Sequence, residues 1–596
     1  MGLHDQRRVY YGEILVSGSL ILLAIVAAQF FHRSWFRNLE RAFFQLGRRR
    51  RTSIAIVFLA AIAVRVALLA WVPVPQPMVH DEFSYLLAGD TFSLGRMSNP
   101  PHPLWQHFET MHVLQQPTYM SKYPPGQGVA LAVGKLLGNA WIGVLLSCAA
   151  MAAAICWMLQ GWMPPSWALL GGFLVIIRLG TLGYWVNSYW GGAVAAIGGA
   201  LVFGALPRLL RRASATHALL MALGVAILAN TRPYEGLALC VGAALLVLLW
   251  PQREKWSLLF AARTWIPLVA GLLVGALLTA YYFYRVTGSP ITFPYSVYWR
   301  QYGFVPLFPW QPFNATPAFH HESIRLLSVD AEYEGYLAQR AGVSVAAFAF
   351  VRALVYWRYF LGPLLTVPVI FTLASTLRNR RFRLLLAAGA IFLVALELET
   401  WRNLHYAAPA TALAYAVVLQ CMRHLRVWPS RKSSLGPLLI CGVVAASLGL
   451  FGFLAPYRHG VVNCPGGPWC GDQSEFPARA HVIEQLRNMG GLHVVIARYG
   501  RNHNPHNEWV YNDADIDHSR IIWAQDMGAR NQELVEYYRD RRSWVLDADS
   551  PNLPLMPYRG LAMPSAITAA APVLSESSNP SNSPRDTSGR GNRRPQ

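Results

Sequence analysis

Two short stretches carry residue types that could take part in chemistry. The stretch VHDEFSYLLAGD, residues 79–90, places Asp81, Glu82 and Tyr85 directly after a nearly uncharged apolar run. A carboxylate in this position can accept a proton from a hydroxyl group. The same acidic pair also suits the first turn of a helix, where the helix dipole favours negative charge. Residue type alone leaves both interpretations open, and His80 is treated as a neighbour only.

The second stretch, SKYPPGQG, places Lys122 and Tyr123 in front of two prolines. Proline fixes its own backbone and biases the preceding residue to an extended conformation, so Lys122 should be held in a defined position. A lysine held beside a membrane surface can bind phosphate, and a lysine that only reaches to the interface is the alternative. His102, His107 and His112 recur at intervals of five and do not share a helical face, which argues against a metal site there.

The elements that must position these residues are membrane-spanning helices. The chain has 596 residues, of which 54% are hydrophobic and only 14% charged, a composition typical of a polytopic membrane protein. The first apolar run lacks a small-residue cleavage site and is interpreted as a retained span. We predict about twelve apolar segments, at roughly 14–31, 54–75, 140–160, 166–182, 191–206, 216–230, 237–250, 264–284, 358–377, 384–397, 405–421 and 436–455.

The distribution of basic residues predicts the orientation of these segments. Alternate connecting loops fall into two sets, of which one carries 21 Lys and Arg in 69 residues and the other carries 9 in 146. This asymmetry places the basic loops in the cytoplasm. It also accounts for much of the net charge of +21, so no nucleic-acid partner is expected. Both chemical stretches therefore lie in external loops.

Further polar and aromatic residues are predicted on the same external side. Arg232, Arg300 and Arg402 could supply positive charge for an anionic head group, and Arg300 lies in the aromatic stretch PYSVYWRQYGF, interpreted as a mobile cover. The turn GYWVNSYWGG carries aromatics that could stack on a sugar or form an interfacial belt, and the sequence does not decide between them. Interfacial helices are predicted over 81–95 and around 105–112.

From about residue 457 the composition changes to that of a soluble domain. Strand, helix and strand patterns in GGLHVVIARYG, SRIIWAQDMG, NQELVEYYRD and RRSWVLDAD predict a small α/β domain. We divide the chain into a transmembrane domain at 1–456, an external domain at 457–562 and a disordered tail at 563–596. A disulfide is expected between Cys464 and Cys470. Polar clusters in the domain are interpreted as surface loops and not as a metal site; they contain His503, His506, Asp513, Asp515, Asp517 and His518.

This arrangement resembles the GT-C superfamily of membrane glycosyltransferases, and within it the protein O-mannosyltransferases and the lipid A aminoarabinose transferases. The resemblance covers about residues 54–420 and rests on the span followed by D-E-x-x-Y, the long external loop and the K-x-P-P-like turn. It implies a GT-C-like fold of about twelve transmembrane helices with external interfacial helices, to which the sequence adds a small C-terminal α/β domain. It also implies a sugar donor linked to a polyprenyl phosphate.

The resemblance assigns roles to individual residues. Asp81 would be the general base on the acceptor hydroxyl, and Glu82 and Tyr85 would orient the acceptor or support Asp81. Lys122 would stabilise the carrier phosphate as it leaves. Tyr123 is inserted before the prolines relative to the aminoarabinose-type K-P-P motif, and the C-terminal domain differs from the β-trefoil domain of eukaryotic mannosyltransferases. A protein, lipid or glycan acceptor therefore stays open.

The implied enzyme is a multi-pass protein of the bacterial inner membrane, in contact with membrane lipids, whose C-terminal domain is extracytoplasmic. No cofactor and no metal ligands are expected, because Lys or Arg can neutralise the leaving phosphate. A transporter or lipid flippase with an external sensory domain is the alternative, supported by Arg65, Arg178 and 352–358 in or near apolar stretches. A third possibility, an enzyme acting on a pyrophosphate carrier, would want metal ligands near Asp81.

Overall fold

The computed structural model describes residues 14–23, 25–26, 33–250, 256–340, 345–401, 403–428, 435–454, 478–500, 503–504, 507 and 509–559. The chain divides into two compact units, residues 1–557 and 558–596, and every helix and strand below belongs to the first. The predicted domain boundaries stay predictions. Several predicted features lie outside the described residues: Arg402, Cys464, Cys470, His506 and the tail at 563–596.

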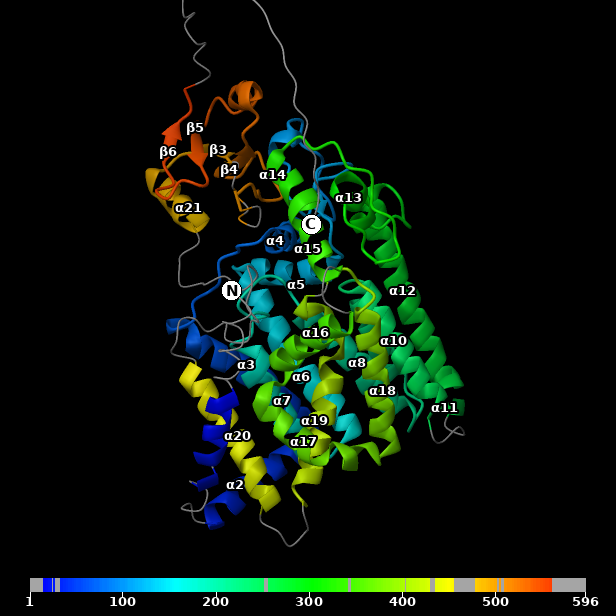
Figure 1. Cartoon of the computed structure of the whole chain (residues 1–596). Helices are drawn as coiled ribbons and strands as arrows, with labels where there is room; N and C mark the ends of the chain where they lie inside the picture. The colour runs from blue at the N-terminus through cyan, green and yellow to red at the C-terminus, as the bar shows by residue number, and fades with distance from the viewer. Residues whose placement is uncertain are drawn as a thin grey trace, which may run out of the picture. The chain divides into compact units, whose positions relative to one another are not determined.

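Most of the first unit is helical, as Figure 1 shows. The helices before the α/β domain are α2 (Arg33–Arg48), α3 (Arg50–Ala67), α4 (His80–Ser93), α5 (Pro125–Leu136), α6 (Ala140–Trp162), α7 (Pro165–Val175), α8 (Ala193–Leu209), α9 (Ala215–Ala229), α10 (Pro233–Leu248), α11 (Trp256–Phe260), α12 (Ala262–Thr287), α13 (Pro294–Tyr302), α14 (Glu322–Arg325), α15 (Glu332–Arg340), α16 (Val345–Phe360), α17 (Gly362–Leu377), α18 (Arg380–Leu396), α19 (Thr411–Leu425) and α20 (Leu435–Leu454).

Among the described residues, four helices are long and apolar enough to cross a membrane, at Arg50–Ala70, Ala140–Trp162, Ala262–Thr287 and Leu435–Gly452. A fifth span is formed if the bent pair at 349–377 is counted as one. The predicted number of about twelve is not confirmed, because the shorter apolar helices have only 10–17 residues and a straight span needs about 20. The chain is a multi-pass helical membrane protein.

Close approach of backbones holds the bundle together around α6. Most of α6 is buried, and a side chain at Gly143 would meet the carbonyl oxygen of Ala130 in α5 at 1.9 Å. A side chain at Gly199 in α8 would meet the carbonyl of Pro409 at the same distance. Small residues at such crossings let helices approach closely where a hydrophobic driving force between helices is missing. The helices around α6 are therefore closely packed.

The helix pair α16 and α17 is bent by 105° at a short break. Gly362 starts α17 with φ of 62°, a conformation that glycine adopts without steric cost. Arg178 donates from Nε to the carbonyl of Tyr359 at 3.1 Å and also binds the carbonyl of Arg358. A cation at the last carbonyls of a helix is favourable. The C-terminus of α16 is thus capped inside the bundle by Arg178.

The first long external loop contains more structure than the sequence indicated. The helix predicted over 81–95 is present as α4, but eleven of its fourteen residues are buried, so it does not lie flat with one apolar face on the interface. Around 105–112 the prediction of a helix is wrong beyond one short 3₁₀ turn at Trp105–Phe108. The chain continues instead into an antiparallel hairpin of β1 (Val113–Leu114) and β2 (Met120–Ser121).

The predicted α/β domain is present and contains a four-stranded sheet of order β4-β3-β5-β6. Its elements are α21 (Ala478–Met489), β3 (His493–Arg498), β4 (Ile521–Gln525), α22 (Asn531–Tyr537), β5 (Arg542–Asp547) and β6 (Leu555–Pro557). Strands β4, β3 and β5 are parallel and β6 is antiparallel. The three parallel strands and α22 match the predicted segments, whereas α21 and β6 were not predicted. Val495, Trp523 and Leu546 form part of its apolar core.

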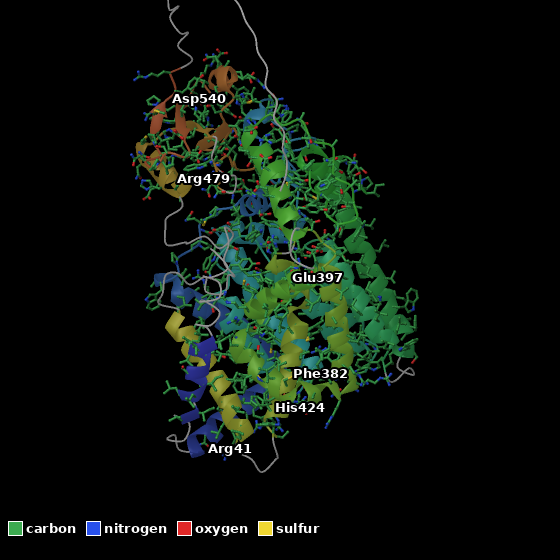
Figure 2. All side chains as sticks on the ribbon, viewed as in Figure 1. Arg41, Phe382, Glu397, His424, Arg479 and Asp540 are labelled. Atoms are coloured by element: carbon green, nitrogen blue, oxygen red, sulfur yellow. The ribbon has the colours of Figure 1, made fainter. Side chains whose placement is uncertain are left out.

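Figure 2 shows Arg41, Phe382 and His424 near the end of the helices that is remote from Arg479 and Asp540 of the α/β domain. All three residues belong to basic loop regions of the sequence, at 32–53, 378–383 and 422–435. The basic regions and the α/β domain thus lie at opposite ends of the helices. This separation agrees with the charge asymmetry along the sequence, and the orientation across a membrane stays a prediction.

Candidate active site

The connection from α3 to α4 is fixed by side chains from within the bundle. Arg65 at the end of α3 donates to the carbonyls of Val72 at 2.8 Å and Pro73 at 3.1 Å. The hydroxyl of Tyr189 donates to the carbonyl of Pro75 at 3.1 Å. An arginine that satisfies two carbonyls of a buried loop rigidifies that loop. The first turn of α4 therefore begins at a defined place.

Glu82 completes this fixation. Its Oε2 accepts hydrogen bonds from the amides of Met78 (2.9 Å) and Val79 (3.3 Å), and its Oε1 accepts one from the amide of Tyr189 (2.9 Å). A glutamate in the first turn that bonds to the amide before its own helix is one half of a capping box. Of the two roles predicted for Glu82, these contacts fit the support of Asp81 and not the orientation of an acceptor.

Asp81 lies next to Glu82 and has different partners. Its Oδ1 accepts a hydrogen bond from the hydroxyl of Tyr123 and lies 3.0 Å from Nδ1 of His112. The ring of Tyr123 stacks on that of Tyr85 with 4.5 Å between centroids. The structure therefore brings together three predicted residues from two separate stretches. It adds His112, which sequence analysis considered only in the series His102, His107 and His112 and without a role beside Asp81.

His112 is held in an unusual backbone conformation. Its φ is 65°, in the left-handed region that few non-glycine residues adopt. Its amide donates to the hydroxyl of Tyr298 at 3.0 Å, while its carbonyl accepts from Ser84 Oγ at 2.6 Å and from the amide of Lys122 at 3.2 Å. These bonds come from α13, α4 and the end of the hairpin. A residue kept in this conformation by three elements is a marker of a functional site.

Lys122 lies in an enclosure of tyrosine rings. Its Nζ is 5.1 Å from the ring centroid of Tyr123, 4.6 Å from that of Tyr295 and 4.4 Å from that of Tyr298. Lys122 is only 4% exposed, and within the described part of the chain it makes no ion pair. Aromatic faces stabilise a cation without neutralising it. Lys122 therefore keeps a positive charge available for an anion.

The charges around Lys122 influence one another. Burial opposes ionisation of Asp81, but His112, His80 and Lys122 together outweigh it and hold the pKa of the carboxyl below its usual range. Burial lowers the pKa of Lys122 to about 8, against the attraction of Asp81 and Glu332. Burial also raises the pKa of Glu332 to about 7, which Lys122 partly opposes. At neutral pH the site holds an ionised aspartate and a charged lysine.

Arg232 lies at the margin of this polar region. It precedes α10, with Nη1 3.6 Å from Oε1 of Glu235 and its guanidinium 4.2 Å from the ring centroid of Tyr406. Burial raises the pKa of the Tyr85 hydroxyl to about 12, and both Arg232 and Asp81 act on that hydroxyl electrostatically. The predicted residue is thus near the site, with a carboxylate partner of its own.

The other predicted arginines are not part of the described cluster. Arg300 is exposed and lies on the face of α13 opposite to Tyr295 and Tyr298, which face Lys122. The structure therefore does not bring Arg300 together with Asp81. Arg402 lies outside the described residues.

The aromatic turn at 183–192 packs inside the protein. Its four large aromatic residues are each at most 6% exposed: Tyr184, Trp185, Tyr189 and Trp190. An interfacial belt requires rings at the surface, so that interpretation is wrong. The turn instead lies against the start of α4, where the amide of Tyr189 binds Glu82. The sequence did not show this burial, because an interfacial belt and a packed core contain the same types of aromatic residue.

Three side chains at the site could hold a metal ion. His80, Asp81 and His112 each offer one ligand atom, and these atoms lie within 4.8 Å of one another. Two imidazoles and a carboxylate suit Zn²⁺ and related ions. Within the described ranges this is the one such group. Of the histidines of the α/β domain that sequence analysis considered, His503 pairs with Asp549 at 2.7 Å and His518 pairs with Asp515 at 2.9 Å.

The arginines inside the helices have structural partners. Besides Arg65 and Arg178, Arg352 donates from Nε to Oε1 of Glu397 at 3.2 Å, and Arg358 is buried at 7% exposure. Charges in a membrane protein that pair with carbonyls or carboxylates are expected to face the interior of the bundle. These arginines hold helices together, so the residues that supported a transporter are explained by the fold.

The fold and site define a multi-pass helical membrane protein with a buried carboxylate–lysine cluster at the end that carries the α/β domain. Comparison with family models found no match, and comparison with curated proteins found none. Among solved structures, the chain is similar to ArnT from Cupriavidus metallidurans in the apo state, with 13% identity over 84% of this chain and 93% of that one and a TM-score of 0.46.

The chain is also similar to the oligosaccharyltransferase of Archaeoglobus fulgidus in the apo form. The match has 11% identity and a TM-score of 0.41, and it covers 75% of this chain and 62% of that one. A structure of AglB from the same organism, in complex with an inhibitory peptide and a dolichol-phosphate, has 10% identity, the same coverage and a TM-score of 0.34. These proteins are members of the GT-C superfamily, which is the superfamily that the sequence motifs resembled. Because the TM-scores are below 0.5, the function below is proposed from the site.

Proposed function

We propose that this protein is a membrane glycosyltransferase that moves a sugar from a polyprenyl-phosphate carrier to a hydroxyl group of an acceptor. The observation that carries the proposal is the arrangement of Asp81 and Lys122 around Tyr123. An ionised carboxylate binds the hydroxyl of Tyr123, and a buried ammonium group lies against the ring of the same residue. One site thus contains a proton acceptor and a cation that makes no ion pair among the described residues.

The two groups suit the two halves of the transfer. The acceptor hydroxyl gives its proton to Asp81 while its oxygen attacks the anomeric carbon of the sugar. The bond between that carbon and the phosphate oxygen breaks, and Lys122 stabilises the negative charge on the departing phosphate. Attack on the face opposite to the phosphate inverts the anomeric centre. A phosphate-linked sugar is already activated, so no further reactant is needed.

The residues of the enclosure have supporting roles. Tyr123 donates its hydroxyl to Asp81 and stacks on Tyr85, so it sets the position of the carboxylate. Tyr295 and Tyr298 shield Lys122 from water, which strengthens its attraction for a phosphate. Arg232 lies within electrostatic reach of Tyr85 and supplies further positive charge.

The proposal is tested with purified protein and a panel of radiolabelled polyprenyl-phosphate sugars. We expect release of sugar from at least one carrier by the wild-type protein, and loss of that release in Asp81→Asn. The matched control is Asp515→Asn, an aspartate of the α/β domain whose carboxylate binds the amide and the ring of His518. If no sugar leaves any carrier, or if Asp81→Asn is as active as wild type, the proposed function is wrong.

A second candidate is favoured by the proximity of His80, Asp81 and His112. A metal ion held there would supply a Lewis acid for a pyrophosphate leaving group, with a carrier of the pyrophosphate class as donor. His112 would then act as a ligand, and Asp81 would not serve as base. Transfer from a pyrophosphate carrier that is abolished by a chelator and restored by Zn²⁺ or Mn²⁺ would establish this candidate. Chelator-resistant transfer from a monophosphate carrier would exclude it.

The setting of the enzyme follows from the same assignment. We propose the bacterial inner membrane, with the cluster and the α/β domain on the extracytoplasmic side and membrane lipids around the apolar helices. The donor enters from the outer leaflet, and the acceptor is a protein, a lipid or a glycan. Labelling of single cysteines introduced at 542 in the α/β domain and at 41 in α2 with a membrane-impermeant reagent in intact cells tests this topology. Only the first position should react.

A further inference from the structure

The α/β domain contacts the helix that carries Asp81. Phe83 of α4 is 2% exposed, and its ring lies 4.7 Å from that of Tyr511, in the segment that leads to β4. Farther along α4, Oδ2 of Asp90 accepts a hydrogen bond from the amide of Ala514 at 2.7 Å. The segment 509–514 of the α/β domain therefore follows α4 from its first turn to its third.

A third contact comes from the hairpin beside α4. The hydroxyl of Tyr119 donates to the carbonyl of Asn512 at 2.9 Å, and Tyr119 is 3% exposed. Asn512 in turn binds Trp523 of β4 in both directions, with Nδ2 to the carbonyl and Oδ1 to the amide, each at 2.8 Å. The segment on α4 is thus joined to the sheet of the domain by hydrogen bonds that leave it little freedom.

Arg479 of α21, labelled in Figure 2, links these parts. It donates from Nε to the carbonyl of Trp509 at 2.9 Å and from Nη2 to the carbonyl of Tyr511 at 2.8 Å. The same guanidinium lies 5.0 Å from the ring centroid of Phe83 and 4.7 Å from that of Trp523. A planar guanidinium can make parallel hydrogen bonds and stack on rings at once.

We propose that Arg479 is a positioning residue through which the C-terminal α/β domain holds α4, and with it Asp81, in place. Phe83 follows Asp81 by two residues, so a shift of its ring moves the first turn of the helix. Lys122 belongs to the end of the hairpin and has its own enclosure, so it is less affected. The expected effect on sugar transfer rests on the proposed function, whereas the expected effect on the position of α4 does not.

Hydrogen–deuterium exchange of the full chain in detergent tests the structural part without any substrate. In Arg479→Ala we expect the amides of 80–93 to exchange at least about tenfold faster than in wild type, because local opening sets the exchange rate. Arg479→Lys keeps a cation but not the paired N–H groups, so an intermediate rate is expected. The matched control is Arg520→Ala, an exposed arginine of the same domain with two weak carbonyl contacts, for which 80–93 should be unchanged.

An unchanged exchange rate of 80–93 in Arg479→Ala, with β3 still protected, overturns the proposal. If Arg479→Ala also speeds exchange in β3, the variant has disturbed the domain itself and not only its contact with α4. Phe83→Leu then tests the same contact from the side of α4. That change removes the ring but keeps an apolar side chain, and it should speed exchange in 509–514 while β3 stays protected. No effect of Phe83→Leu on 509–514 also overturns the proposal.

Kinetics separate positioning from a general loss of stability. If transfer activity is found, Arg479→Ala should lower kcat about tenfold with little change in the KM for the donor, since Asp81 moves and Lys122 does not. A rise in KM with an unchanged kcat would contradict this role. Absence of transfer in wild type would refute the proposed function, while the exchange experiment would still decide whether Arg479 holds α4.

Discussion

Two groups of buried charge in this protein differ in how their charges are satisfied. Inside the helices, Arg208 donates to the carbonyls of Gly204 at 2.5 Å and Trp157 at 2.7 Å and lies 4.1 Å from the ring centroid of Trp157. At the other group, Lys122 faces rings without an ion pair among the described residues, and Asp81 shares its Oδ1 between Tyr123 and His112.

The comparison shows that burial of a charge does not by itself identify a functional site. A charge that donates to backbone carbonyls stabilises the fold, since removing it removes those hydrogen bonds. A buried charge that is enclosed by rings and makes no ion pair among the described residues is costly for stability and has capacity for a ligand. The first group should therefore respond to mutation through stability, and the second through activity.

The largest effect is expected at Asp81. Asp81→Asn should lower kcat by about 10²–10⁴-fold, the range that a general base contributes, with only a small change in Tm, because the amide oxygen of asparagine can still accept the hydrogen bond from Tyr123. Turnover of a radiolabelled donor and thermal unfolding of the same preparation measure both quantities. A large drop in Tm together with lost activity would remove the distinction between the two groups.

Lys122→Met should come second. A charge-assisted contact with phosphate contributes about 1.5–3 kcal/mol, so the KM for the donor should rise by about 10- to 100-fold. The apolar replacement fits an enclosure of rings, and Tm should be unchanged or higher. Donor titrations at fixed acceptor concentration give the value. Unchanged donor kinetics would remove Lys122 from the site.

Arg208→Met is the matched change in the other group. It removes two hydrogen bonds to backbone carbonyls, so the free energy of unfolding should fall by about 1–2 kcal/mol, while the kcat of folded protein stays within about twofold of wild type. Thermal or denaturant unfolding in detergent, with activity per folded protein, is the measurement. A selective loss of activity at unchanged Tm would contradict the structural role.

The smallest effect is a dependence on pH. Burial lowers the pKa of Lys122 to about 8, and the phosphate requires the protonated form. Raising the pH through 8 therefore removes the charge, and kcat/KM for the donor should fall by about tenfold per unit above it. In Lys122→Arg this decline should disappear, because arginine stays protonated. A decline at the same pH in both proteins would assign it to another group.

Parts of this site could be predicted from the sequence. The acidic pair after an apolar run and the lysine before two prolines are local patterns, and the structure places Asp81, Tyr85, Lys122 and Tyr123 in one cluster. The charge asymmetry of the loops needs no structure either, because it follows from composition. The three parallel strands of the α/β domain were predicted for the same reason.

Three tyrosines of α13 also follow a helical pattern in the sequence. Tyr295, Tyr298 and Tyr302 recur at i, i+3 and i+7, the spacing of one face of a helix. We interpreted this stretch as a mobile cover with Arg300 as its functional residue. The helical spacing would have predicted a tyrosine face, with Arg300 on the opposite side.

His112 and Glu332 had no comparable signal. His112 enters the site through a left-handed backbone conformation in a turn, and Glu332 is the first residue of α15, more than 200 residues farther along the chain. Neither the distance of such residues from Asp81 nor their burial is encoded in a local pattern. The sequence by itself determined the apolar segments, the distribution of charge and the first candidates for chemistry, because these depend on neighbouring residues. Only the tertiary structure decided which buried charges are already satisfied, because that depends on contacts between segments far apart in the chain.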